Sequence, residues 1–167
     1  ITRDGMSIRF SEEALRDQGR ATIGVKGITL KKGDRVESLV VVEPGATLLV
    51  ATENGYGKRT AFEEYRSQSR GGKGIITIKA SERNGHVVGA HAVRDADAIM
   101  LITSEGQMIR MPVSDLRVIS RNTQGVRLIN LEEGDKLVSA TTVEPEDETD
   151  ATPENETEDA SPAPSAD

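Results

Sequence analysis

The chain has no cysteine and no tryptophan, and its aromatic residues are limited to Phe10, Phe62, Tyr56 and Tyr65. The lack of cysteine excludes disulfide bonds and thiolate chemistry, and it is compatible with a reducing cytoplasm. No apolar run approaches the roughly 20 residues that a membrane-spanning helix needs, and no charged-then-apolar leader opens the chain. With so few aromatic side chains, a core must be built from Val, Ile and Leu.

The charge is divided unevenly between a long body and a short C-terminal stretch. Residues 144–167 contain ten of the 28 acidic residues and no Lys or Arg, so residues 1–143 keep 18 acidic residues against all 21 Lys and Arg, a net charge of +3. The stretch 144–167 also has four prolines and no large apolar residue. Such a segment cannot bury enough surface to offset its conformational entropy, which predicts a disordered acidic tail. A basic body suggests a polyanion-binding surface for which the tail competes, although solubility alone explains such a tail equally well.

The body contains one pattern three times, at intervals of about 50 residues. Each copy has a Thr, a Gly three residues later, and an Arg four residues after that Gly. Apolar runs precede the last two copies, so the pattern predicts a strand, a tight turn at the Gly and a return strand that carries the Arg. The copies are residues 2–5, 52–55 and 103–106, with Arg9, Arg59 and Arg110.

Each copy continues with a second glycine that opens a further strand and with a turn that leads to a last one. The second glycines are Gly27, Gly74 and Gly125, and the last strands are expected at residues 36–42, 87–93 and 137–143. Units of about four strands and 50 residues are typical of propeller blades. Helical periodicity is lacking, and only residues 12–17 could form a short helical turn.

We therefore predict an all-β fold of propeller-like blades. The units are residues 1–43, 44–94 and 95–143, followed by the acidic tail at residues 144–167. Only Ile1 remains of the strand that should precede the first turn, and a ring of blades normally needs four or more. We expect further blades ahead of residue 1.

One loop of the second unit combines glycines with positive charge. The stretch Gln68-Ser69-Arg70-Gly71-Gly72-Lys73-Gly74 has three glycines in four positions, bracketed by two cations, and it leads directly into a strand. Backbone amides uncovered by a Cβ, together with Lys and Arg, suit a phosphate backbone. A Gly-rich turn with two solvated charges is the simpler interpretation of this stretch taken alone.

Several stretches together resemble the C-terminal domain of the bacterial DNA gyrase A protein. They are Asn54-Gly55-Tyr56-Gly57-Lys58-Arg59-Thr60, residues 68–74, Glu82-Arg83-Asn84-Gly85, Arg121-Asn122-Thr123-Gln124-Gly125-Val126 and the acidic tail. Residues 68–74 resemble the gyrase-A box, which has the form Gln-basic-Arg-Gly-Gly-basic-Gly, except that Ser69 replaces a basic residue. We interpret this stretch as a secondary copy, with the principal box expected upstream.

The resemblance implies a six-bladed β-pinwheel whose basic rim wraps double-stranded DNA and so supports ATP-dependent negative supercoiling. The holoenzyme would be a type II DNA topoisomerase, a heterotetramer with the gyrase B protein, in the cytoplasm at the nucleoid and not at a membrane. The segment itself would carry no catalytic residue, metal or cofactor, because ATP and Mg²⁺ are used elsewhere in the holoenzyme. The DNA-binding residues expected here are Arg9, Lys58, Arg59, Arg66, Gln68, Arg70, Gly71, Gly72, Lys73, Gly74, Arg110 and Arg121, and Arg117 and Arg127 add charge nearby.

The three repeated arginines also have a structural interpretation. Each could pair with an acidic residue of its own blade, and the candidates are Glu13, Glu64 and Asp115. Blade symmetry alone does not separate this role from DNA binding.

Catalytic interpretations find little support. Residues 67–74 are not a P-loop, because Ser67 and Gly74 occupy positions that need Gly and Ser or Thr. His86 and His91 lack metal-ligand companions at suitable spacing. Two alternative functions remain: the C-terminal domain of the topoisomerase IV A protein, and a kelch-like propeller that binds a protein partner. The nearly complete box favours the gyrase family over the first, and the absence of Trp disfavours the second.

Overall fold

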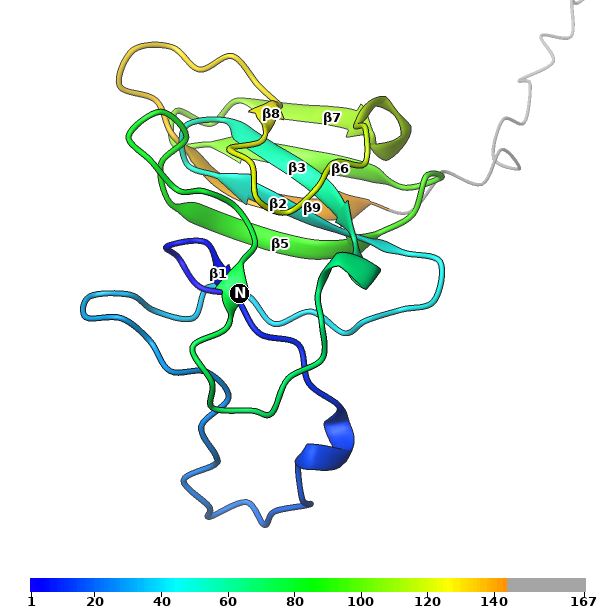
Figure 1. Cartoon of the computed structure of the whole chain (residues 1–167). Helices are drawn as coiled ribbons and strands as arrows, with labels where there is room; N and C mark the ends of the chain where they lie inside the picture. Colours follow the sequence, from blue (N-terminus) through cyan, green and yellow to red (C-terminus); the bar gives the residue numbers. More distant parts are fainter. Residues whose placement is uncertain (144–167) are drawn as a thin grey trace, which may run out of the picture.

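The computed structural model describes residues 1–143, and the predicted acidic tail at residues 144–167 lies outside the described residues (Figure 1). The described part is almost entirely strands and loops, with three 3₁₀ turns labelled η. The elements are β1 (Met6–Ser7), η1 (Glu12–Ala14), β2 (Thr47–Thr52), β3 (Tyr56–Ala61), η2 (Phe62–Glu64), β4 (Ile75–Ile76), β5 (Val87–Val93), β6 (Ala98–Thr103), β7 (Met108–Pro112), η3 (Val113–Asp115), β8 (Val126–Arg127) and β9 (Leu137–Val143). The all-β prediction is confirmed. The helical turn expected at residues 12–17 is the single turn η1.

The repeated Thr-x-x-Gly pattern forms the predicted hairpin turns. In the second repeat the Gly55 amide donates to the Thr52 carbonyl at 3.0 Å, and the Thr52 hydroxyl donates to the Tyr56 carbonyl at 3.0 Å. Gly55 has a φ of +77°, a conformation that glycine adopts without steric cost. β2 and β3 then pair in antiparallel register from Thr47 opposite Ala61 to Ala51 opposite Gly57.

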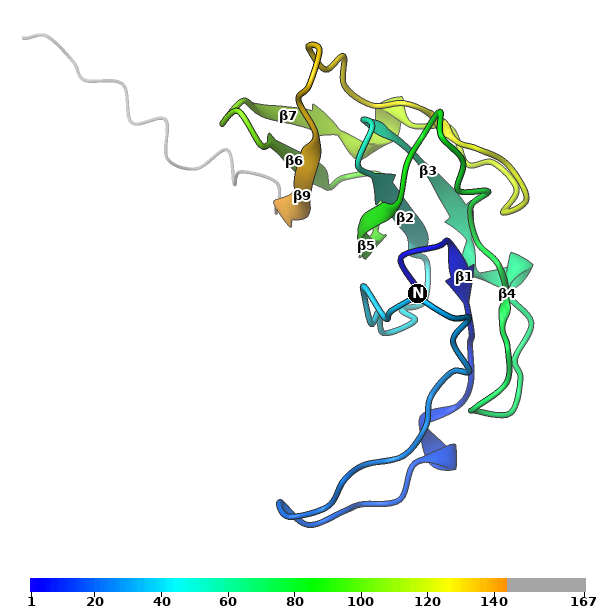
Figure 2. The same cartoon turned by 90° about the vertical axis from the view of Figure 1, so that its left-hand side faces the viewer.

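The sheets are shared between consecutive repeats. The second repeat contributes β2, β3 and β5 to a sheet of order β5-β2-β3-β8, whose last strand belongs to the third repeat. In the same way, β4 of the second repeat pairs with β1 of the first. Each repeat therefore extends one strand onto the hairpin of the repeat before it. The sheets follow one another along an arc (Figure 2).

Two apolar clusters fill the spaces between the sheets. Leu49 and Ala51 of β2 pack into one cluster with residues of β6 and β9, whereas Leu48 and Val50 pack into the other with Phe62 and Ile78. Successive residues of a strand point to opposite faces, so β2 is buried on both sides. This explains why its sequence is continuously apolar rather than alternating.

The first repeat departs from the prediction of a last strand at residues 36–42. Only Val36 makes a β-bridge, to Thr2, and Leu39 and Val41 are 87% and 66% exposed. The corresponding strands β5 and β9 pair with β2 and β6, which precede the turns of their repeats. In the first repeat, this segment bonds to Ile1, whose carbonyl accepts from the Glu37 amide at 3.0 Å and from the Ser38 amide at 3.3 Å.

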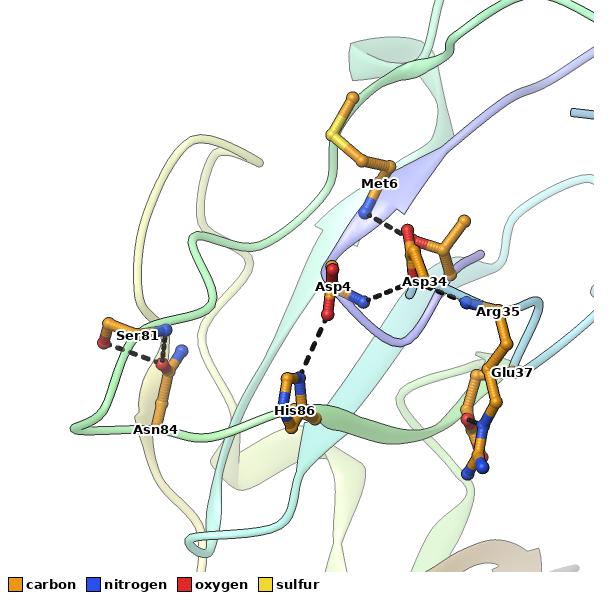
Figure 3. Close-up of polar contacts among 9 residues, drawn as sticks. Asp4, Met6, Asp34, Arg35, Glu37, Ser81, Asn84 and His86 are labelled. Atoms are coloured by element: carbon orange, nitrogen blue, oxygen red, sulfur yellow. Dashed lines mark hydrogen bonds and ion pairs between the residues drawn. The ribbon is translucent and has the colours of Figure 1, made fainter. Parts of the chain in front are cut away.

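Polar contacts instead fix the turn of the first repeat. The Asp4 amide donates to Asp34 Oδ1 at 3.0 Å, and Asp4 Oδ1 lies 3.1 Å from His86 Nδ1 in the second repeat (Figure 3). His86 thus joins two repeats.

Candidate nucleic-acid interface

The box-like loop, residues 68–74, lies against the first repeat along most of its length. The Gln68 amide donates to the Arg9 carbonyl at 2.8 Å, and the Gly71 amide donates to the Gly27 carbonyl at 2.6 Å. The Thr29 amide donates in return to the Gly72 carbonyl at 2.8 Å. The loop is therefore fixed by backbone hydrogen bonds at the junction of two repeats, which we call the first junction.

The glycines of this loop serve the junction itself. Gly74 has a φ of +73°, and a Cβ there would lie 2.3 Å from the Ser7 carbonyl oxygen. Gly71 has a φ of +81°, and its amide is already bonded within the protein. Gly72 is half-buried beside Ile8. The sequence predicted amides open to phosphate, whereas the structure gives Gly71 and Gly74 roles in close backbone contact.

The cations of the loop, by contrast, face outward. Arg66, Arg70 and Lys73 are exposed. The Arg70 guanidinium leans on the first repeat, with Nε 3.3 Å from the Ala14 carbonyl and Nη1 3.5 Å from the Lys26 carbonyl. Gln68 is half-buried, and its Nε2 atom has no hydrogen-bond partner among residues 1–143.

One of these backbone contacts recurs at the second junction, between the second and third repeats. The Ile119 amide donates to the Arg59 carbonyl at 2.9 Å, as Gln68 does to Arg9. Arg121 follows Ile119 by two residues, as Arg70 follows Gln68, and its Nη1 atom donates to the Ile76 carbonyl of the preceding repeat at 2.9 Å. Arg121 is therefore the structural counterpart of Arg70, and exposed Arg117 lies just ahead of it.

Arg9 and Arg59 make internal contacts across these junctions. Arg9 Nη1 donates to the Phe62 carbonyl at 2.8 Å, and Arg59 Nη1 donates to the Val113 carbonyl at 2.9 Å. Both carbonyls begin the 3₁₀ turn of the following repeat. Arg59 is only 6% exposed and also forms an ion pair with Asp95. Both arginines therefore make internal contacts, but these are with the following repeat, so the suggested pairing with an acidic residue of the same blade, Glu13 or Glu64, was wrong.

Arg110 occupies the corresponding place on β7, at the end of the described repeats, and it is exposed. Asp115, the acidic partner suggested for it, also lies on the surface.

Lys58 is buried, unlike the loop cations. It is 1% exposed, and its Nζ atom donates to the carbonyls of Ser120 (2.9 Å) and Arg121. Burial lowers the pKa of Lys58 to about 8. The negative charge of Glu64 acts to raise this pKa, and the positive charge of Arg121 acts to lower it. In the first repeat the equivalent residue is Ile8. Lys58 supports the loop that carries Arg121 from inside.

This burial predicts a pH dependence of stability. The pKa of Lys58 rises from about 8 in the folded chain to its ordinary value of 10.5 on unfolding, so between these values the unfolded chain binds more protons. Stability must then increase with pH in that window. We expect the free energy of unfolding of wild type relative to Lys58→Met to rise between pH 7.5 and 9.5, measured by denaturant titration. A difference that does not change with pH would contradict the burial of this ammonium group.

Comparison with known proteins identifies the family. The sequence model of the DNA gyrase C-terminal domain, described as a beta-propeller, matches residues 1–43, 46–94 and 97–144. The chain belongs to the DNA gyrase C-terminal domain family. The resemblance noted in the sequence is thereby confirmed.

Curated relatives support the family assignment at the level of sequence. The chain is 48% identical over 151 residues to the DNA gyrase A protein of Escherichia coli K12, covering 90% of the chain and 17% of that protein. It is 50% identical over 141 residues to the DNA gyrase A protein of Mycobacterium tuberculosis H37Rv, covering 83% of the chain and 17% of that protein. The chain thus spans about a sixth of the length of these curated relatives.

Solved structures support the family assignment at the level of the fold. The structure of a DNA gyrase A C-terminal domain matches with a TM-score of 0.79 at 29% identity, covering 85% of this chain and 48% of that one. The C-terminal domain of a DNA topoisomerase IV matches with a TM-score of 0.81 at 28% identity, covering 88% and 46%. The shared fold does not separate the two kinds of enzyme.

The second junction also contains a cation cluster that sequence reasoning missed. Arg83 and Arg127 both lie over the ring of Tyr56, with their Cζ atoms 5.0 and 5.4 Å from its centroid. The sequence showed Arg127 as one charge among several and gave no signal of the pairing with Tyr56 and Arg83, because the three residues come from separate segments.

Within residues 1–143, no helix has the length and hydrophobicity to cross a membrane.

Proposed function

We propose that this chain is part of the DNA-wrapping region of a DNA gyrase A protein. It would bind double-stranded DNA and support ATP-dependent negative supercoiling by a holoenzyme with the gyrase B protein, at the bacterial nucleoid in the cytoplasm. The observation that carries the proposal is the repetition of one cation-bearing loop at two successive junctions along an arc. Exposed cations spaced along a curved edge suit a bent duplex, which they bind through phosphates and deformability rather than base sequence.

The contribution to the enzyme would be mechanical and electrostatic. We assign no catalytic residue, metal or cofactor to residues 1–143, so DNA cleavage and ATP hydrolysis would occur elsewhere in the holoenzyme. Of the residues predicted from sequence, the proposal retains Arg66, Arg70, Lys73, Arg110 and Arg121 as phosphate contacts. It assigns Arg9, Lys58 and Arg59 to the scaffold, because their charged groups contact carbonyls of the following repeat.

A role in the topoisomerase IV A protein is the second candidate, since a domain of that enzyme has a similar fold. The nearly complete box at residues 68–74 and the identities of 48–50% to gyrase A proteins favour gyrase. A supercoiling assay separates the two. If the full-length parent chain, assembled with its ATPase partner, only relaxes DNA, the gyrase assignment fails.

The box cations provide the direct test. Replacing Arg70 and Lys73 by Ala in the full-length parent chain removes two proposed phosphate contacts. Log K falls with log salt, and each lost contact should make this slope less steep by roughly 0.9. The slope is measured by fluorescence anisotropy with duplex DNA. The matched control is the double variant Arg35→Ala/Arg94→Ala, which removes two cations that already pair with Glu37 and Glu43. If the slope of the Arg70/Lys73 double variant equals that of wild type and of the control, Arg70 and Lys73 do not contact DNA.

A further inference from the structure

We propose that Arg83 and Arg127, held against Tyr56, form a phosphate-binding site at the second junction whose ligand is a phosphodiester group of the DNA backbone. The inference rests on the proposed DNA-binding function and adds a contact site to it. Both guanidinium Cζ atoms lie near one ring centroid, at 5.0 and 5.4 Å, so they are at most 10.4 Å apart, the sum of those distances. A planar guanidinium offers paired donors that match phosphate oxygens. Two guanidiniums within this distance can contact neighbouring phosphates of one DNA strand.

Three segments build the site. Tyr56 opens β3 and Arg127 ends β8, and the two residues are direct partners in the β3–β8 pair (Figure 1). Arg83 lies in the turn ahead of β5. The side chain of Asn84 fixes that turn, since its Oδ1 accepts hydrogen bonds from the Ser81 amide (2.8 Å) and the Ser81 hydroxyl (2.9 Å; Figure 3).

The guanidiniums are positioned by neutral groups. Arg127 donates to Asn130 Oδ1 at 3.0 Å and to the Tyr56 hydroxyl at 2.9 Å, and Arg83 donates to Gln124 Oε1 at 3.3 Å. No ion pair within residues 1–143 involves either arginine. Two cations close together without a carboxylate repel one another, and an anion placed between them relieves that repulsion.

The two arginines also act on the tyrosine beneath them. Hydrogen bonding to Arg83 and, next, to Arg127 lowers the pKa of the Tyr56 phenol, because both guanidiniums favour the phenolate. Tyr56 is 7% exposed, whereas both arginines are exposed. The ring therefore forms the floor of the site, and the charged groups face solvent.

Comparison with the first junction shows that the fold does not require this cluster. Met6 and Ile76 are direct partners in the β1–β4 pair, as Tyr56 and Arg127 are in the β3–β8 pair. The residue before Asp34, which corresponds to Asn84, is Gly33 in place of Arg83. The first junction thus makes the same strand pair with apolar side chains.

The cluster also places positive charge where the loop of the second junction has a neutral residue. Lys73 of the first junction corresponds to Gln124 in the second, where the loop has a neutral side chain. Arg83 donates its hydrogen bond to that same Gln124. The guanidinium of Arg83 therefore lies beside the position where the first junction has its ammonium, so both junctions present cations at equivalent places along the arc.

The test uses the full-length parent chain and duplex DNA. In Arg83→Gln/Arg127→Gln, the slope of log K against log salt should become less steep by roughly 1.8, at about 0.9 for each lost contact, and affinity at 50 mM salt should fall on the order of 100-fold. The double variant Arg35→Gln/Arg94→Gln removes the same charge from existing ion pairs and should leave the slope near that of wild type. Equal slopes for the two double variants would overturn the site.

Two further variants separate binding from folding. Arg83→Lys/Arg127→Lys keeps the charges and should recover the wild-type slope, which a purely structural role of the arginines would not produce. Tyr56→Phe keeps the ring and should retain most of the slope. If Arg70→Ala/Lys73→Ala lowers the slope while Arg83→Gln/Arg127→Gln does not, only the new site fails. If neither does, the proposed DNA-binding function fails with it.

Discussion

Replacement of Gly55 by Ala should destabilise the fold far more than the same replacement at Gly106. The two glycines are equivalent turn residues with φ values of +77° and +84°, so both substitutions incur the cost of a left-handed conformation, roughly 1–2 kcal/mol. At Gly55, however, a Cβ would lie 2.7 Å from the Ile129 carbonyl oxygen. That oxygen belongs to the backbone of the next repeat and cannot rotate away.

The clash at Gly55 would also disturb hydrogen bonds to the next repeat, which increases the expected loss of stability. The Gly55 carbonyl accepts hydrogen bonds from the Leu128 amide (2.8 Å) and the Ile129 amide (3.2 Å), each contributing about 0.5–1.5 kcal/mol. We therefore expect a total loss of about 3 kcal/mol or more for Gly55→Ala in denaturant unfolding of the parent chain. Around Gly106 the described residues leave the Cβ position open, with nothing within 4 Å. Equal losses for the two variants would mean that another segment packs against the turn at Gly106.

Arg59→Met should reduce stability without changing the salt dependence of DNA binding. The substitution leaves the Val113 carbonyl without its buried donor, and an unsatisfied buried acceptor costs about 1–3 kcal/mol. The ion pair with Asp95 adds little, because the Asp95 side chain is 78% exposed. We expect the free energy of unfolding to fall by about 2 kcal/mol, as judged by denaturant titration.

Arg70→Met is the matched comparison for Arg59→Met. Arg70 is exposed and makes only long contacts to carbonyls, so its replacement should lower the salt slope and leave stability within about 0.5 kcal/mol of wild type. A reversed pattern, with Arg59 changing the slope and Arg70 changing stability, would exchange the roles that we assign to them.

The parts of the fold that depend on neighbouring residues could be predicted from the sequence. The Thr-x-x-Gly turns give β2–β3 and β6–β7, because a positive φ at Gly55 or Gly106 and a local hydrogen bond are enough to specify a hairpin. The partners of β4 and β8 could not be predicted. Their glycines signal a strand, but the contact that selects its partner is made with another repeat, about 70 residues earlier in the chain.

The exposure of the loop cations was predictable from the sequence, but the surroundings of each arginine were not. The loop at residues 68–74 does carry exposed cations at a junction. Arg59 and Arg70 look alike in sequence, since each is a cation close to glycines in a repeated motif, yet one is buried and the other is not. What separates them is the 3₁₀ turn of the following repeat, which packs over Arg59. Its position depends on tertiary packing.

Strand sharing makes the repeats thermodynamically inseparable in a particular way. β8 of the third repeat completes the sheet that contains β2 and β3 of the second. Part of the stabilising free energy therefore belongs to interfaces between neighbouring repeats rather than to single repeats, as in a one-dimensional chain of coupled sites. If the second repeat were moved into a relative, its β4 would have to pair with the first repeat of that relative. Its own β3 would have to pair with the strand that the relative has in place of β8. Exchange of one repeat between relatives therefore changes two strand pairs, and compatible recombination should favour blocks of consecutive repeats over single ones.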